Sequence, residues 1–134
     1  MMKIIIDCNV WISFLLGFQK QWMRDVLENE HIHVYVCSQL TNEITNVAAR
    51  SKISSRIASD DLEKLFRIIN AYCHIENISQ QAVSSIRDSK DLYLLSFAET
   101  IEADFIVTGD NDLLILNMHG KTRIVSPAQF KQLF

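Results

Sequence analysis

Two aspartates follow apolar segments at points where a predicted strand ends. Asp7 comes directly after Ile4–Ile6, and Asp110 follows the apolar segment 105–108 after one glycine. Because the carboxyl ends of parallel strands meet at one edge of a sheet, we expect both carboxylates at a single site. Each has a simpler alternative: Asp7 could cap the helix that follows, and Asp110 could belong to a type I or Asx turn.

Two further acids fall on predicted helices. Glu43 lies three residues after Leu40 and four before Val47, so it shares their apolar face. An ionised glutamate there is costly unless it is paired or bound to a metal, although its long stem could also reach water. Asp91 lies one turn before Leu94 at the start of a strong helical pattern. There it could equally be a first-turn acid that the helix dipole favours.

These four carboxylates together predict a metal site. Clustered carboxylates repel one another and raise each other's pKa, so they are not assembled for stability. Oxygen ligands alone suit Mg²⁺ or Mn²⁺ better than zinc. Two such ions roughly 3.5–4 Å apart can activate a water and stabilise the leaving oxygen of a phosphodiester.

Predicted strands and helices alternate along the chain, which indicates a parallel sheet with helices on both faces. The expected strands cover 3–7, 33–37, 73–77, 104–108 and 121–125. The expected helices cover 11–16, 19–29, 38–50, 60–72 and 89–103, with shorter helices or turns at 79–87 and 111–117 and a last helix starting at Pro127.

The composition limits the classes of protein that fit. A chain of 134 residues with 49% hydrophobic and 22% charged residues is typical of one globular domain, 1–134. The net charge of −3 argues against a broadly basic coat, so any nucleic-acid contact must be local or assisted by metal. Three cysteines without C-x-x-C spacing suit a reducing cytoplasm. We expect no membrane association, because no apolar run approaches about 18 residues.

The segments that carry these acids resemble the PIN-domain family of metal-dependent nucleases. The stretch IIIDCNVWIS is similar to the opening strand and acid of the family, and SQLTNEITNV to its second acidic motif. The stretch RDSKDLYLLSFAETIEADFIVTGDNDLLIL resembles the D-x-x-D segment, strand and T-G-D-x-D-L-L of a subgroup of toxin components, and IVSPAQF also fits that subgroup. One departure is Ser89, where the subgroup often has proline.

The resemblance implies a three-layer α/β/α sandwich with a central, mostly parallel sheet, and endoribonuclease activity with Mg²⁺ or Mn²⁺. It assigns the catalytic acids and metal ligands to Asp7, Glu43, Asp91 and Asp110, with Asp112 as a further acid near the metal. Asp88 competes with Asp91, although it precedes the helix. Asn9 and Thr108 match polar positions that would hold the carboxylates or a water in place.

The implied reaction has no protein nucleophile: a water activated by the bound Mg²⁺ or Mn²⁺ would attack the scissile phosphorus, leaving a 5′-phosphate and a 3′-hydroxyl. Substrate RNA needs positive charge around such a site. The candidate basic residues are Arg50, Lys52, Arg56, Arg87 and Lys90. The first three could instead be cations at a helix C-terminus followed by a solvated loop.

The toxin subgroup also implies partners, namely RNA, a small antitoxin protein and a second copy in a homodimer. The helical stretch 11–27 is rich in large apolar groups and could meet such a partner, or simply form core. Two other functions compete. One is a non-catalytic PIN-fold module that binds RNA or protein. The other is phosphotransfer through an aspartyl phosphate on Asp7, although Asn9 breaks the D-x-D pattern of aspartate-nucleophile phosphatases.

Overall fold

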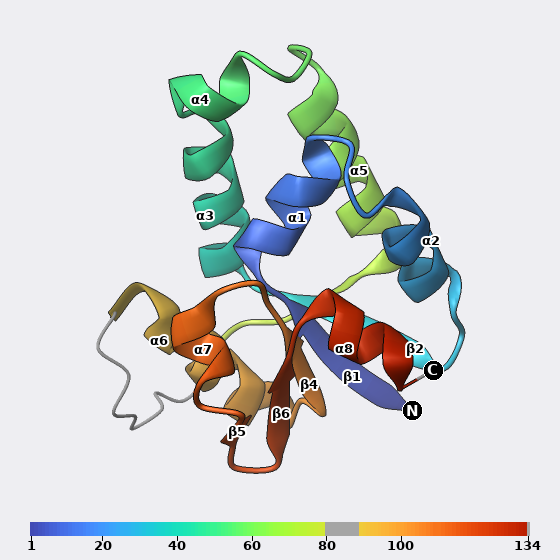
Figure 1. Cartoon of the computed structure of the whole chain (residues 1–134), viewed down its shortest axis with the longest axis vertical. Coiled ribbons are helices and arrows are strands. Elements are labelled where there is room, and N and C mark those ends of the chain that lie inside the picture. Colours follow the sequence, from blue (N-terminus) through green and yellow to red (C-terminus); the bar gives the residue numbers. More distant parts are fainter. Residues whose placement is uncertain (80–88, 134) are drawn as a thin grey trace.

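A computed structural model gives the fold, and it describes residues 1–79 and 89–133, with the side chains of 89–91 outside the description. The strands are β1 (Met2–Ile6), β2 (Ile32–Val36), β3 (His74–Ile75), β4 (Phe105–Val107), β5 (Met118–His119) and β6 (Thr122–Val125). They form one sheet in the order β3-β2-β1-β4-β6-β5 (Figure 1). Every neighbouring pair is parallel except β5 and β6.

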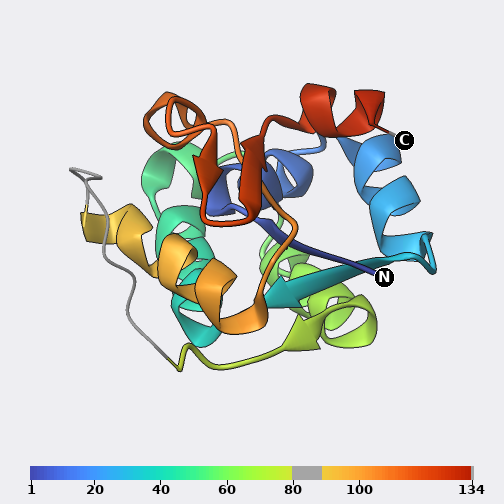
Figure 2. The ribbon, with the colours of Figure 1, turned by 90° about the horizontal axis from the view of Figure 1, so that it is seen from below.

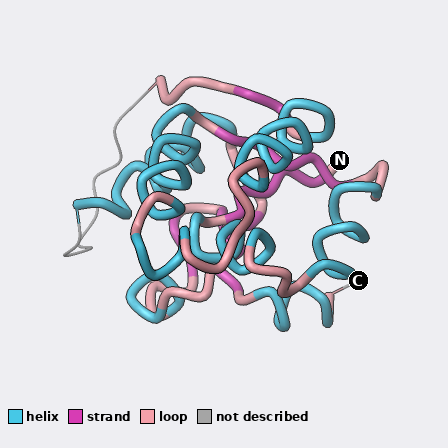
Figure 3. Tube along the Cα trace, turned by 90° about the horizontal axis from the view of Figure 1, so that it is seen from above, coloured by secondary structure: helices cyan, strands magenta, loops and turns pink. Residues whose placement is uncertain are grey.

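Helices cover both faces of this sheet. They are α1 (Cys8–Leu15), α2 (Lys20–Glu28), α3 (Ser38–Ala48), α4 (Ser51–Ser54), α5 (Asp61–Tyr72), α6 (Ser89–Ile101), α7 (Asn111–Leu114) and α8 (Pro127–Gln132). Helices α1, α3, α4 and α5 rise on one side, whereas α6 packs against β1 and β4 from the other (Figures 1 and 2). Seen from above, helices cover much of the strands (Figure 3). The expected PIN-like α/β architecture with a mostly parallel central sheet is therefore confirmed.

The central strand explains its own sequence. Ile4–Ile6 have no exposed surface, because β1 pairs with β2 on one side and β4 on the other while helices cover both faces. A strand enclosed in this way has no solvent face, so its sequence is a continuous apolar run without alternation. The buried run delivers the next residue, Asp7, to the carboxyl edge of the sheet.

Several boundaries differ from the expectation. Helix α1 begins at Cys8, three residues early, because Asp7 caps it. The predicted helix 38–50 ends at Ala48, and a separate short helix, α4, follows. Strand β5 was not predicted; it forms a hairpin with β6 across Gly120, whose φ of +59° suits glycine. The predicted helix at 79–87 falls, apart from its first residue, outside the described residues.

The C-terminal helix is stabilised by a capping box at its N-terminus and by the packing of one aromatic side chain. Ser126 caps α8 in a capping box with Gln129, and Pro127 occupies the first turn as expected. The ring of Phe130 lies edge-on to Trp22 at 6.1 Å and to Phe105 at 5.4 Å between centroids. This contact joins α8 to both α2 and the sheet. Within the described part of the chain, no helix is long and apolar enough to cross a bilayer.

Replacing Phe130, which is 1% exposed, should therefore be costly. We expect Phe130→Ala to lower the free energy of unfolding by about 3–5 kcal/mol, because a buried ring is lost and a cavity remains. Leu133→Ala, at a position 43% exposed, is the control and should change it by less than about 0.5 kcal/mol. Urea unfolding followed by circular dichroism measures both values. Equal, small losses in the two variants would show that Phe130 does not anchor α8.

Candidate active site

Asp7 is a buried carboxylate held by three donors. It is 4% exposed and follows β1 directly. Its Oδ1 accepts from the backbone N–H of Cys8 at 2.7 Å, which caps α1. Its Oδ2 accepts from the hydroxyl of Thr108 at 2.7 Å and from the side-chain amide of Asn9 at 3.1 Å. The capping role that the sequence left open is thus observed, and the same side chain sits at the carboxyl edge of the sheet.

The loops after β1 and β4 are joined through Thr108 and Asn9. The fully buried Thr108 hydroxyl donates to Asp7 and accepts from the backbone N–H of Asp110 at 3.0 Å. The Asn9 amide lies 3.3 Å from the same hydroxyl, and its Oδ1 accepts from the N–H of Gly109 at 2.9 Å. These bonds are possible because β1 and β4 are neighbours in register, with Ile6 opposite the residue before Thr108. Both polar residues therefore hold the Asp7 carboxylate, whereas their role toward a bound water stays a prediction.

Asp110 is half-buried and caps α7. Its Oδ1 accepts from the backbone N–H of Asp112 at 2.9 Å, which is the turn that the sequence offered as the simpler alternative. Asp112 itself is exposed in the first turn of α7. Helix α7 thereby brings the Asp110 carboxylate to the same edge as Asp7, whereas a metal-binding role for Asp112 stays a prediction.

Glu43 is half-buried at the margin of the apolar face of α3, beside the buried side chains of Leu40 and Ile44. Its Oε1 accepts a hydrogen bond from the hydroxyl of Tyr93 at 2.5 Å, so the carboxylate is not simply directed to water. Sequence reasoning missed Tyr93. The only available signal was that a half-buried tyrosine hydroxyl usually finds a partner, which does not say which partner.

The charges of Glu43 and Asp110 both act on the carboxyl group of Asp7. Burial is the main cause that raises the pKa of Asp7 to about 6. The hydrogen bonds from Thr108 and Cys8 lower this pKa, whereas the negative charges of Glu43 and Asp110 raise it further. Burial also raises the pKa of Cys8 to about 12, with help from Glu43 and Asp7, so this thiol is inert.

A family model described as PIN domain matches residues 3–112, a range that contains all four predicted acids. The chain belongs to the PIN-domain family. This family includes metal-dependent nucleases, and its members are commonly ribonucleases that use divalent metals. The sequence-based identification is therefore confirmed.

The solved structures that resemble this chain include two of low sequence identity. One is a domain of a functionally unknown protein from Methanocaldococcus jannaschii, with a TM-score of 0.54 and 15% identity. The match covers 87% of this chain and 84% of that one, so the two share a similar fold. Another is the PIN domain of RRP44 from T. brucei, with a TM-score of 0.48, 13% identity, and coverage of 98% and 79%. The comparison with curated proteins gives no match.

The donors of this PIN domain suit a hard cation in type, since the acids at the sheet edge offer carboxylate oxygens. Among the described residues, however, no three side chains of His, Cys, Asp or Glu gather closely enough to hold a metal ion. Asp91 lies in the first turn of α6, but its side chain is outside the described residues, as is that of Lys90. Asp88 and Arg87 lie outside them entirely. The complete quartet therefore stays a prediction.

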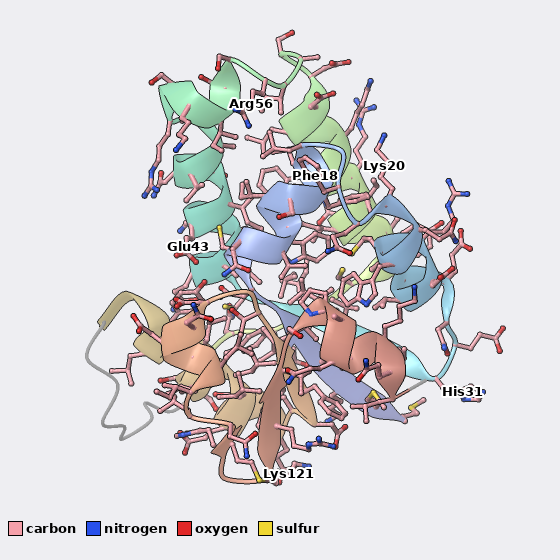
Figure 4. All side chains as sticks on the ribbon, viewed as in Figure 1. Phe18, Lys20, His31, Glu43, Arg56 and Lys121 are labelled. Atoms are coloured by element: carbon pink, nitrogen blue, oxygen red, sulfur yellow. The ribbon has the colours of Figure 1, made fainter. Side chains whose placement is uncertain are left out.

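The basic residues predicted for an RNA rim fall on and around α4. Arg50 directly precedes this helix, Lys52 lies within it, and Arg56 follows it; all three are exposed. The charge of Arg50 lowers the pKa of Cys8, so its field reaches the thiol that follows Asp7. Arg56 lies beside α4, whereas Glu43 lies near the opposite end of α3, which is closer to α6 and α7 (Figure 4).

The raised pKa of Asp7 predicts a pH-dependent stability of the metal-free protein. In an unfolded chain this carboxyl has its ordinary pKa of 3.8, against about 6 when folded, so between these values the folded state holds a proton that the unfolded state lacks. The stability of wild type relative to Asp7→Asn is therefore greatest below pH 4. It should fall by up to about 3 kcal/mol as the pH rises through 6.

Urea unfolding with a chelator present, at intervals between pH 4 and 7.5, measures this difference. Contributions shared by both proteins cancel in the comparison. Asp25→Asn, which changes an exposed acid on α2, controls for the number of charges alone. A constant difference between wild type and Asp7→Asn across this range would contradict the electrostatic picture of the site.

Proposed function

We propose that this PIN domain is a metal-dependent endoribonuclease that hydrolyses RNA phosphodiester bonds. The observation that supports it most is the Asp7 carboxylate, buried at the carboxyl edge of the sheet and repelled by Glu43 and Asp110. The raised pKa of Asp7 means that its ionised form is costly in the metal-free protein. A cation between such groups would offset both the burial and the repulsion.

Asp7, Glu43, Asp91 and Asp110 would hold this cation, and their oxygen donors favour Mg²⁺ or Mn²⁺. A bound divalent ion would supply activation of a water and neutralisation of charge on the phosphate. The chain itself orients Asp7. Of roughly four lone-pair sites on a carboxylate, Oδ2 uses two for Thr108 and Asn9, and Oδ1 uses one for Cys8. Asp7 would therefore present Oδ1 to the cation.

RNA would approach from the side of the molecule that carries α4 and its exposed basic residues. A phosphate next to four carboxylates is repelled unless positive charge lies close by, and Arg50 is a cation whose charge acts on the thiol of Cys8, next to Asp7. Lys52 within α4 and Arg56 just after it extend this basic surface. Such a local patch is compatible with the acidic net charge of the chain.

We further propose that the protein is the toxin of a type II toxin–antitoxin pair and that it forms a homodimer. The toxin assignment rests on the T-G-D-x-D-L-L stretch and the IVSPAQF end, which resemble the toxin subgroup. The natural inhibitor would be a small antitoxin protein. The site of action would be the cytoplasm, where the free thiols of Cys8, Cys37 and Cys73 remain reduced.

The nuclease proposal predicts that Asp7→Asn abolishes cleavage of single-stranded RNA in the presence of Mn²⁺, because the substitution removes a ligand charge. The variant keeps nearly the same side-chain volume, and circular dichroism verifies that it folds. Asp25→Asn is the matched control and should cleave as wild type does. Wild-type protein that binds RNA without cleaving it would instead favour a non-catalytic module.

The toxin proposal predicts that induced expression of the wild-type chain arrests bacterial growth, whereas expression of Asp7→Asn at the same level does not. Growth curves and immunoblots of both cultures provide the measurement. Normal growth at high levels of active, RNA-cleaving protein would reject the toxin role and leave the nuclease assignment intact.

A further inference from the structure

A hydrogen bond crosses the site from α6 to α3. The hydroxyl of Tyr93, in the first part of α6, donates to Oε1 of Glu43 at 2.5 Å. The two residues are fifty positions apart in the sequence, on helices that do not follow one another in the chain. This length is typical of a hydroxyl bonded to a carboxylate, which is among the stronger hydrogen bonds in proteins.

Asp7 and Asp110 accept hydrogen bonds from groups at the sheet edge itself, whereas the donor to Glu43 lies on another helix. Asp7 has three donors from its own loop and the end of β4, and Asp110 accepts from a backbone N–H two residues on. Within the described part of the chain, the hydroxyl of Tyr93 is the only hydrogen-bond donor to the carboxylate of Glu43.

Several factors favour conformations in which the Glu43 carboxylate points away from the site. It is half-buried, so its carboxylate could turn to water, and its long side chain has more rotatable bonds than an aspartate. The negative charges of Asp7 and Glu43 repel each other, and this repulsion adds to the raised pKa of Asp7. Something must hold this carboxylate at the edge of the sheet while no cation is bound.

We propose that Tyr93 is a positioning residue that holds the Glu43 carboxylate in the site and commits its Oε1, leaving Oε2 for a divalent cation. This inference rests on the proposed metal-dependent function and adds a residue that the acidic motifs do not contain. Tyr93 follows Asp91 by two residues on α6. The same hydrogen bond therefore fixes the start of the helix that carries Asp91 against α3, which carries Glu43.

The test compares Tyr93→Phe with Tyr72→Phe, each of which removes one hydroxyl; Tyr72 is 52% exposed on α5 and serves as the matched control. Mn²⁺ binding to the RNA-free proteins is measured from the electron paramagnetic resonance signal of unbound Mn²⁺. We expect Tyr93→Phe to weaken Mn²⁺ binding about tenfold, the lower end of what loss of a partner behind a metal ligand costs. Tyr72→Phe should bind as wild type does.

A double-mutant cycle with Glu43→Asp tests whether Tyr93 acts through Glu43. The shorter acid keeps its charge but cannot reach the hydroxyl, so adding Tyr93→Phe should weaken Mn²⁺ binding no further. In cleavage assays, Tyr93→Phe should need about tenfold more Mn²⁺ for half-maximal rate yet recover most of the rate at saturating Mn²⁺. A residue needed only for folding would not produce this recovery.

Three outcomes would overturn the proposal, and they differ from one another. If wild type and Tyr93→Phe bind Mn²⁺ equally, the positioning role fails and the nuclease proposal stands. An equal loss in the Glu43→Asp background would show that Tyr93 acts without Glu43. If wild type binds no Mn²⁺ at millimolar concentration, the metal-dependent function fails, and the role of Tyr93 fails with it.

Discussion

The hydroxyl of Thr108 is the interaction on which the site depends. It joins the ends of β1 and β4 by donating to Asp7 and accepting from the backbone of Asp110. One buried oxygen thus sets the separation between two segments that are about a hundred residues apart in sequence. The parallel pairing of β1 with β4 makes these hydrogen bonds possible, because the last residues of the two strands, Ile6 and Val107, lie opposite each other. Without that register the two acids would have no fixed relation to each other.

The acidic edge shows how a fold can accommodate groups that oppose its stability. The apolar core supplies the favourable free energy, and it includes the fully buried isoleucines of β1. Asp7 is then placed in a buried position where its charge is unfavourable, and Glu43 and Asp110 add to the cost. A carboxylate can serve a helix as its cap and still carry this strain, because the cap uses only one of its lone pairs.

Much of the arrangement follows from the sequence alone. The isoleucines of β1 predicted a doubly covered strand, and the position of Asp7 after them predicted its place at the sheet edge. Boundaries were harder: α1 starts early because its cap is also the site acid, and the two-residue β5 has too little sequence to form a pattern. The Tyr93–Glu43 contact could not be predicted, since it depends on how α6 and α3 are placed by the sheet between them.

Both outermost strands of the sheet, β3 and β5, have only two residues. A short edge offers few free N–H and C=O groups, so another chain cannot extend the sheet by pairing with it over any length. The expected encounter with a second copy or a protein inhibitor would therefore use side chains on helices in place of a shared sheet. This also protects the molecule from open-ended strand addition, which is the usual hazard of an exposed sheet edge.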